Sequence, residues 1–148
     1  RFDQAFYRIK NPKKIKTELL LNSKKPMFIC GSTWPQDEDV LLTFAPEIHK
    51  NFNWIFAPHE TNEMHLSQLE KKIIDKGLTS LRYSRATEWC TSNEAPILII
   101  DQVGILADLY PLCQAAFVGG SFKDKVHSVM EPLCAGLPVL VGPYHHNN

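Results

Sequence analysis

Residues 26–33 read PMFICGST, a short and continuously apolar run followed at once by a small polar loop. A run of this kind is typical of a strand buried on both faces, as the strands of parallel sheets are. A helix is predicted directly after it, because Pro35 stands where a first helical turn tolerates proline. Asp37, Glu38 and Asp39 follow, and acidic side chains stabilise the positive end of a helix dipole. The segment therefore predicts a strand, a loop and a helix in succession.

The predicted helix runs on to His49 and Lys50, basic residues that suit its negative end. The same alternation of apolar runs and amphipathic stretches continues along the chain. Further strands are predicted at 53–57, 81–83, 96–101, 115–118 and 138–141, and further helices at 62–76, 104–112 and 129–135. This alternation indicates an α/β fold class, a Rossmann-like doubly wound parallel sheet with helices on both faces. Such sheets bind ligands at the carboxyl ends of their strands, so the candidate site lies in the loops that follow the strands.

The composition fits a single globular domain over residues 1–148. Of these residues, 44% are hydrophobic and 22% are charged, with a formal net charge of zero, the profile of a soluble protein with its own core. A zero net charge argues against nucleic acid as a partner, because its backbone demands a basic face. No apolar run is long enough to span a membrane, and the sequence starts without a secretory leader. The chain begins at Arg1 rather than with methionine, so we expect a fragment of a longer protein.

The four cysteines, Cys30, Cys90, Cys113 and Cys134, form no C-x-x-C pair. A zinc site or a disulfide framework would need tighter spacing. Cys30 ends an apolar run and Cys134 lies in a predicted helix, and in such settings a reduced thiol packs as a small hydrophobe. We therefore expect structural thiols in a reducing compartment.

The loop of Gly31, Ser32 and Thr33 after the first strand is a candidate anion site. Backbone N–H groups of such a turn can hold a phosphate or a carboxylate, with help from the hydroxyls. The alternative is that Ser32 or Thr33 caps the helix that follows.

The loop of Gly119, Gly120 and Ser121 is a second candidate, because paired glycines let another molecule approach the backbone closely. A tight turn without a ligand explains the glycines equally well. Neither G-x-G-x-x-G nor G-x-x-x-x-G-K-[ST] occurs in the chain, which argues against hydride transfer and against a P-loop ATPase.

Glu131 lies at the start of the predicted helix 129–135, where its carboxylate could accept both hydroxyls of a ribose. The alternative is structural, because Ser128 and Glu131 have the spacing of a capping box. His59 follows a predicted strand and could contact a phosphate or a base.

No metal site or serine triad is predicted. No two of the histidines 127, 145 and 146 have the i, i+4 helical spacing of a zincin, and the adjacent pair His145-His146 points two ways. A serine nucleophile would need a G-x-S-x-G elbow that is absent.

Several motifs together resemble those of one known family, the 3-deoxy-D-manno-octulosonic acid (Kdo) transferases, in order and in spacing. They are Arg1-Phe2-Asp3, Gly31-Ser32-Thr33-Trp34, Ala57-Pro58-His59-Glu60, Asp101–Tyr110, Val118-Gly119-Gly120-Ser121, His127–Pro132 and Leu137–Pro143. The match extends over nearly the whole chain, which resembles the C-terminal half of a two-domain GT-B glycosyltransferase. The N-terminal acceptor domain and the final C-terminal helices would then be absent.

The resemblance implies transfer of Kdo from CMP-Kdo to a lipid A precursor in lipopolysaccharide biosynthesis, with inversion and without a metal or other cofactor. The whole enzyme would act at the cytoplasmic face of the inner membrane, bound there through the missing domain that also carries the general base. This chain would be soluble and inactive alone. The implied donor-binding residues are Gly31, Ser32, Thr33, Pro58, His59, Val103, Gly104, Ile105, Gly120, Ser121, Ser128 and Glu131. Pro58, His59 and residues 103–105 would contact cytidine and phosphate, Glu131 would bind the ribose, and Arg1 would stabilise charge in the transition state.

The chain departs from the family at four positions. Ile105 replaces a frequent glutamate, Val126 a glycine, Ser128 an asparagine, and Pro58 an arginine. Two alternatives stay open, namely another GT-B glycosyltransferase or nucleotide-sugar epimerase, and a non-catalytic α/β nucleotide-binding module. A preference for CMP over UMP or UDP would distinguish the Kdo transferase from other nucleotide-sugar enzymes.

Overall fold

The computed structural model describes residues 3, 15–21, 23–90, 94–122 and 127–143. Within these ranges six strands form one sheet in which every pair of neighbours is parallel. The strands are β1 (Met27–Thr33), β2 (Asn53–Pro58), β3 (Ser80–Arg82), β4 (Ile97–Ile99), β5 (Ala115–Val118) and β6 (Val139–Val141). Each overlaps a strand predicted from the sequence, so the predicted parallel α/β sheet is confirmed.

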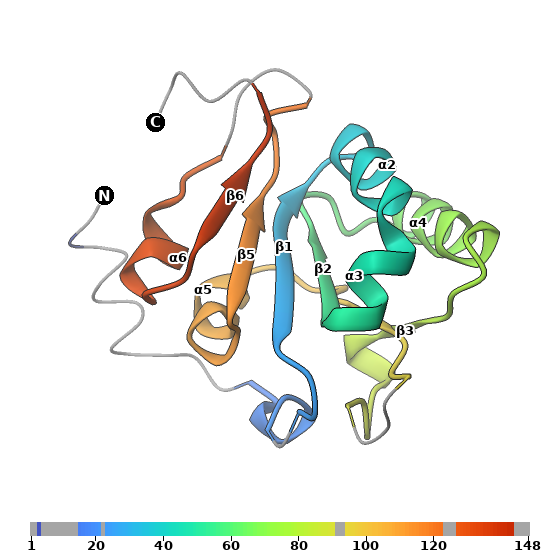
Figure 1. The fold of residues 1–148 in the computed structure, drawn as a ribbon, viewed down its shortest axis with the longest axis horizontal. Helices are drawn as coiled ribbons and strands as arrows, with labels where there is room; N and C mark the ends of the chain where they lie inside the picture. Colours follow the sequence, from blue (N-terminus) through green and yellow to red (C-terminus); the bar gives the residue numbers. More distant parts are fainter. Residues whose placement is uncertain (1–2, 4–14, 22, 91–93, 123–126, 144–148) are drawn as a thin grey trace.

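The strand order β3-β4-β2-β1-β5-β6 places β1 near the middle of the sheet (Figure 1). The chain builds one half of the sheet beyond β2, then crosses over β1 and builds the other half from β5 and β6. Because all strands run in one direction, their carboxyl ends meet at one edge, at the top of Figure 1. The boundary between β1 and β5 is the topological switch point of the sheet, the place where ligands of such folds bind.

Most of the helices that connect these strands are short, and α4 is the longest of them at 13 residues. They are α2 (Pro35–Thr43), α3 (Ala45–Asn51), α4 (Glu63–Asp75), α5 (Leu106–Leu109) and α6 (Met130–Cys134), with 3-10 turns η1 (Thr17–Leu19), η2 (Tyr83–Arg85) and η3 (Tyr110–Leu112). Among the described residues, none of the helices has the length and apolar character of a membrane span.

Two predicted helices are wrong in their extent, and each is interrupted at a proline. The helix predicted up to Lys50 is broken at Phe44, because Pro46 in the first turn of α3 cannot continue the hydrogen-bond ladder of α2. The helix predicted at 104–112 begins later, at Leu106, and changes to the 3-10 turn η3 at Tyr110, next to Pro111.

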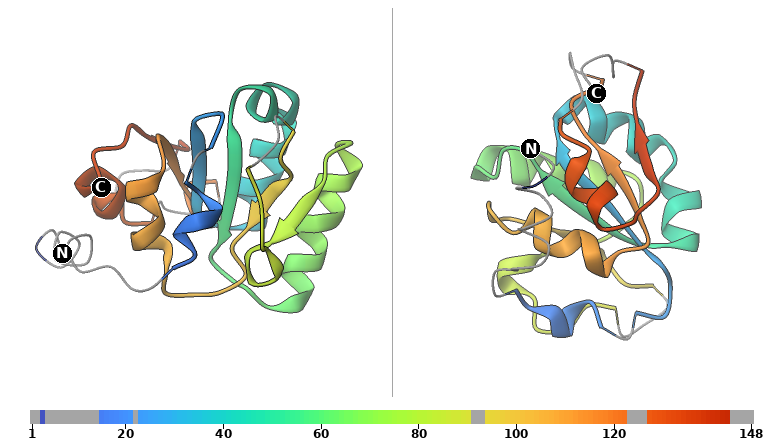
Figure 2. Two further views of the ribbon diagram at one scale, coloured as in Figure 1. Left: turned by 90° about the horizontal axis from the view of Figure 1, so that it is seen from below. Right: turned by 90° about the vertical axis from the view of Figure 1, so that its left-hand side faces the viewer.

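Helices lie on both sides of the sheet, as the two views in Figure 2 show, and each side has its own hydrophobic core. On one side Leu41 of α2 and Leu69 of α4 belong to the same cluster as Phe56 of β2. On the other side Leu109 of α5 belongs to the cluster that contains Ile55. Ile55 and Phe56 are consecutive residues in opposite cores, because side chains alternate between the two faces of a strand. The predicted doubly wound arrangement is therefore confirmed.

The cysteines lie within this framework as free thiols. Cys30, Cys90 and Cys113 are buried, and Cys134 is partly buried. Burial raises the pKa of the Cys113 thiol to about 12, so it stays protonated and unreactive near neutral pH. The thiols pack as small apolar groups, as the sequence predicted.

Candidate functional site

The loops that follow β1 and β5 touch each other at the switch point. The Gly119 N–H donates a hydrogen bond to the Gly31 carbonyl at 2.8 Å. A Cβ atom on Gly119 would lie 2.3 Å from the Ser32 carbonyl oxygen and 2.7 Å from the Thr33 Cα atom. Gly119 therefore lacks a side chain because the backbone of the neighbouring loop occupies that space. The close approach that its sequence predicted is made by the chain itself.

The buried carboxylate of Asp37 links the same two loops. It accepts hydrogen bonds from the Trp34 N–H at 2.8 Å, the Gly120 N–H at 2.9 Å and the Phe122 N–H at 3.4 Å. Asp37 is completely inaccessible to solvent. The sequence predicted Asp37 only as an acid in the first turn of a helix. The contacts with the loop after β5 join residues 83 and 85 positions apart, so no local pattern indicated them.

Three aromatic rings from three different loops stack at this edge of the sheet. The Trp34 and His59 rings lie 4.5 Å apart between centroids, and the His59 and His127 rings lie 4.6 Å apart. The Trp34 Nε1–H donates to the His127 Nε2 atom at 2.8 Å, so that nitrogen carries no proton. The ring of His59 thus lies across the hydrogen-bonded Trp34–His127 pair. The cluster joins the ends of β1 and β2 to the segment that follows β5.

A cleft of about 200 Å³ opens beside this ring cluster, at the carboxyl ends of β1, β2 and β4. Its lining residues are Ser32, Ala57, Pro58, His59, Ile100, Gln102, Val103, Gly104 and Leu106. Among these are predicted donor-binding residues from three separate loops, namely Ser32, Pro58, His59, Val103 and Gly104. The structure therefore brings together residues from three loops that are far apart in the sequence.

Ser32 occupies a strained backbone position in the wall of this cleft. Its φ angle is 54°, in the left-handed region that residues other than glycine rarely adopt. The pairing of β1 with β2 shifts register there, between Gly31 and Thr33. A register shift of this kind marks a β-bulge or a similar irregularity at the strand end, and strained residues cluster at ligand sites.

At other predicted donor-binding positions, the side chain is buried, or buried groups of the core fill the space around the residue. A Cβ atom on Gly31 would lie 2.2 Å from the buried Tyr110 hydroxyl. The Thr33 hydroxyl is buried and donates to Glu38 at 2.8 Å. Ile105 is buried in the core cluster beside α5. These residues can offer a ligand only their backbone groups. The alternative capping role is wrong, because Trp34 is the N-cap residue of α2 and Asp37 accepts its N–H.

The predicted residues after β5 are divided between the interior and the surface. Gly120 and Ser121 are buried, whereas Ser128 is exposed. The predicted capping box of Ser128 and Glu131 does not form, because α6 begins at Met130 and the Ser128 hydroxyl accepts the Met130 N–H at 3.3 Å. Burial raises the pKa of Tyr110, and the negative charge of Glu131 adds to the effect. Glu131 is thus within electrostatic reach of Tyr110, whose hydroxyl packs against β1.

Arg1, Phe2 and Val126 lie outside the described residues, as do His145 and His146. Their predicted roles stay predictions. Within the described ranges, no group of three or more His, Cys, Asp and Glu side chains could hold a metal ion.

A buried network of hydrogen bonds joins the end of β1 to the helices α2 and α4. Glu38 is completely buried, and it accepts the Thr33 hydroxyl through one oxygen and contacts the His65 Nε2 atom at 2.7 Å through the other. The hydrogen bond to Glu38 raises the pKa of His65, although partial burial opposes the change. Through this network, Glu38 of α2 contacts His65 of α4 close to the candidate site.

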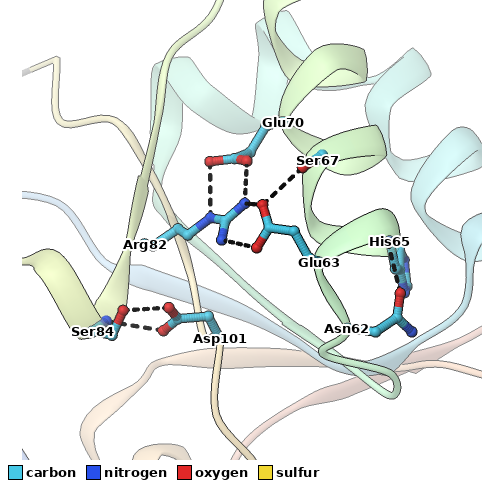
Figure 3. A network of polar contacts seen from close by, with 8 residues as sticks. All are labelled: Asn62, Glu63, His65, Ser67, Glu70, Arg82, Ser84 and Asp101. Atoms are coloured by element: carbon cyan, nitrogen blue, oxygen red, sulfur yellow. Dashed lines mark hydrogen bonds and ion pairs between the residues drawn. The ribbon is translucent and has the colours of Figure 1, made fainter.

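A second polar network anchors the loops after β3 and β4 (Figure 3). Arg82 donates to both carboxylate oxygens of Glu63, at 2.7 and 2.8 Å, and to those of Glu70, at 2.7 and 3.2 Å. The hydrogen bonds from Arg82 lower the pKa of Glu63 to about 2. Nearby, Ser84 donates its backbone N–H at 2.9 Å and its hydroxyl to Asp101. These contacts hold Asp101 at the base of the loop that lines the cleft.

The fold and the position of the cleft define a class of protein. A doubly wound parallel sheet with a cleft at its carboxyl edge, beside the switch point, is the architecture of nucleotide-binding α/β domains. No protein-family model matches this sequence. Individual proteins do match it.

Kdo transferases are among the similar proteins. The chain is 30% identical over 131 residues to the 3-deoxy-D-manno-octulosonic acid transferase of Chlamydophila psittaci, covering 86% of this chain and 29% of that protein. It is 32% identical over 144 residues to the enzyme of the same name from Chlamydia muridarum, covering 94% of this chain and 32% of that protein. The chain thus spans about a third of the length of these relatives. The resemblance to Kdo transferases is confirmed, and the chain is related to them over most of its own length.

A solved structure has the same fold. It is described as the C-terminal CMP-Kdo binding domain of WaaA from Acinetobacter baumannii, and it superimposes with a TM-score of 0.73 at 21% identity. The match covers 98% of this chain and 74% of that one. The predicted fold, a Rossmann-like half of a GT-B structure, is therefore confirmed.

Proposed function

We propose that this chain is the donor-binding part of a Kdo transferase and that it binds CMP-Kdo. The observation that carries the proposal is the cleft at the carboxyl edge of the sheet, lined by Ser32, His59 and Gly104. These residues come from three of the loops that carry the family resemblance, and they meet at the carboxyl edge of the sheet, the edge at which doubly wound sheets bind nucleotides. The two relatives described above are named Kdo transferases, and the similar solved domain is described as binding CMP-Kdo.

The chemistry of the cleft suits a nucleoside monophosphate. The exposed His59 ring stacks on both Trp34 and His127, which form a hydrogen-bonded pair, so we expect its other face to be available to a base. Gly104 is exposed and has a φ of 90°, so its backbone can approach a phosphate without hindrance from a side chain. Glu131 would bind the ribose hydroxyls, as the family resemblance implies.

The proposed reaction also needs groups outside the described residues. The whole enzyme would transfer Kdo to a lipid A precursor in lipopolysaccharide biosynthesis, at the cytoplasmic face of the inner membrane. The acceptor and the membrane would be bound by a further domain that also supplies the general base. Arg1 would stabilise the negative charge of the departing CMP, since a cation lowers the barrier where such charge develops. No metal would be required, so EDTA should leave both donor binding and transfer unchanged.

Calorimetric titration of this chain with CMP, UMP and UDP tests the donor assignment. We expect CMP to bind more tightly than either uridine nucleotide. Replacement of His59 by alanine should weaken CMP binding about tenfold, or ~1.4 kcal/mol, because a base would lose its stacking partner. His49→Ala is the matched control, because that histidine lies near the end of α3, on the side of the amino ends of β1 and β2, where its carbonyl accepts a hydrogen bond from Lys25. Equal affinity for CMP and UDP would instead favour another nucleotide-sugar enzyme.

A second titration tests the ribose contact. Wild-type chain should bind CMP more tightly than 2′-deoxy-CMP, and Glu131→Gln should remove most of this difference. Glu47→Gln, an exposed change on α3, should preserve it. An unchanged preference in Glu131→Gln would contradict the ribose assignment and favour a nucleotide-binding module of another kind.

A further inference from the structure

The carboxylate of Asp37 lies at the place where many doubly wound folds hold a ligand phosphate. That place is the start of the helix after β1, beside the loop that follows the strand across the switch point. Backbone N–H groups from both loops point at one small negatively charged group there. In this chain the negatively charged group belongs to the protein, because Asp37 accepts the Trp34 and Gly120 N–H groups at 2.8 and 2.9 Å.

We infer that Asp37 is a positioning residue that fills the phosphate position at the switch point with its own carboxylate and directs the donor phosphate to the neighbouring cleft. The inference rests on the proposed function, since it concerns where the CMP phosphate binds. It assigns that phosphate to the side of β1 that faces β2 and β4, near Ser32 and Gly104, and away from Gly120.

The hydrogen-bond donors at the switch point support this assignment, because they are already used within the chain. The Gly119 N–H donates to the Gly31 carbonyl, and the Thr33 hydroxyl donates to Glu38. A phosphate at the same place would have to displace a buried carboxylate. It would also meet the negative charge of Asp37 at close range, where two like charges repel strongly in a site shielded from water.

The lack of room for a ligand at the switch point also supports placing the phosphate in the cleft. The loops after β1 and β5 approach so closely that a Cβ atom on Gly119 would clash with the Ser32 carbonyl. The open cleft lies instead between the ends of β1, β2 and β4, and Ser32 forms part of its wall. A phosphate in this cleft stays next to the same strand end without entering the contact between the two loops.

Asp37 also acts on the cleft through Trp34. It holds the Trp34 backbone, and the Trp34 ring stacks on His59 and donates a hydrogen bond to His127. His59 lines the cleft. Loss of the Asp37 carboxylate should therefore disturb the ring cluster that forms one side of the cleft, although Asp37 itself touches no ligand.

Amide chemical shifts of the wild-type chain, followed by NMR during titration with CMP, test where the phosphate binds. CMP should shift the Gly104 and His59 amides, and cytidine should shift the His59 amide with less effect on Gly104. The Gly120 and Trp34 amides should change little with either compound. Larger shifts of the Gly120 and Trp34 amides with CMP than with cytidine would overturn the inference, while the proposed nucleotide binding would stand.

Chemical rescue tests whether Asp37 acts as an internal anion. Asp37→Ala removes the carboxylate and leaves its N–H partners around a small vacant space. The variant should bind CMP about tenfold more weakly than wild type, because loss of the carboxylate releases the loops that it held. Added formate, a carboxylate of matching size, should restore most of this affinity, whereas chloride at the same ionic strength should not.

Asp39→Ala is the control for this experiment. Asp39 lies two residues further along the same helix, where it is 62% exposed and pairs with Lys72 at 2.8 Å. Its replacement should leave CMP affinity unchanged, with or without formate.

Failure of formate to act on Asp37→Ala would overturn the internal-anion role, because a purely structural loss is not repaired by a small carboxylate. If Asp37→Ala does not fold without formate, recovery of folding with formate supports the role and absence of recovery contradicts it. Absence of CMP binding in the wild type would contradict the proposed function instead, and formate-dependent stability of Asp37→Ala would still test the carboxylate.

Discussion

Replacement of Gly119 by alanine should be the most damaging single-methyl change at the switch point. The new Cβ atom would lie 2.3 Å from the Ser32 carbonyl oxygen, 2.7 Å from the Thr33 Cα atom and 2.8 Å from the Ser32 carbonyl carbon, all of them backbone atoms. An ordinary contact needs at least 3.4 Å, so the two loops would have to separate by about 1 Å. No flexible side chain is available to absorb this movement.

The cost follows from two effects. Overpacking in a rigid interior typically costs about 1–3 kcal/mol. The separation would also stretch the hydrogen bond from the Gly119 N–H to the Gly31 carbonyl from 2.8 Å to beyond bonding distance, at about 1 kcal/mol. We therefore expect Gly119→Ala to lower the free energy of unfolding by about 2–4 kcal/mol, a large share of the stability of a domain of this size.

Urea unfolding of wild type and variant, monitored by circular dichroism, measures this loss. Gly77→Ala is the matched control, because Gly77 has a φ of 76° and nothing lies within 4 Å of its missing Cβ. The control change introduces backbone strain without a clash and should cost about 1 kcal/mol. If Gly119→Ala destabilises the chain no more than Gly77→Ala, the close approach of the two loops is not what requires glycine, and the reasoning fails.

Two further changes test the strand end and the buried network of hydrogen bonds that joins it to α2 and α4. Ser32→Gly should raise the free energy of unfolding by about 0.5–1 kcal/mol, because glycine adopts the φ of 54° without strain while losing more entropy on folding; a loss of stability in urea unfolding would show that the serine side chain outweighs the strain. The raised pKa of His65 means that the folded state binds the His65 proton more tightly than the unfolded state does. The contribution of this proton to the free energy of unfolding is fully present below the ordinary pKa of histidine, about 6.5. It disappears as pH rises through the higher folded-state value. Stability measured between pH 5.5 and 8.5 should therefore fall with rising pH more steeply in wild type than in His65→Gln, and equal slopes would contradict a proton-linked contact with Glu38.

Much of the fold was predictable because its signals are local. A continuous apolar run specifies a strand buried on both faces, and an amphipathic stretch after it specifies a covering helix. Local signals also existed for the two helices whose extent was wrong. Pro46 and Pro111 each interrupt an apolar periodicity that otherwise continues, and the proline outweighs the periodicity because it removes a backbone N–H donor.

The candidate site was predictable in part. The rule that parallel strands end at one edge was enough to select Ser32, His59 and Gly104, and the structure places all three in one cleft. The same rule also selected Thr33 and Ile105, whose side chains are buried. It could not separate the two groups, because the direction of a loop side chain depends on what packs against it.

By itself, the sequence determined the α/β class, the parallel sheet and the loops in which a nucleotide site could lie, because each of these follows from patterns a few residues long. The tertiary structure decided how those loops are used. Asp37 contacts Gly120 across 83 residues, and the Trp34 ring contacts His127 across 93 residues. Such contacts depend on the order of the strands within the sheet, and this order is set by the packing of the whole chain. For this reason, only the folded chain shows that the glycine-rich switch point is closed by an internal carboxylate and that the open cleft lies beside it.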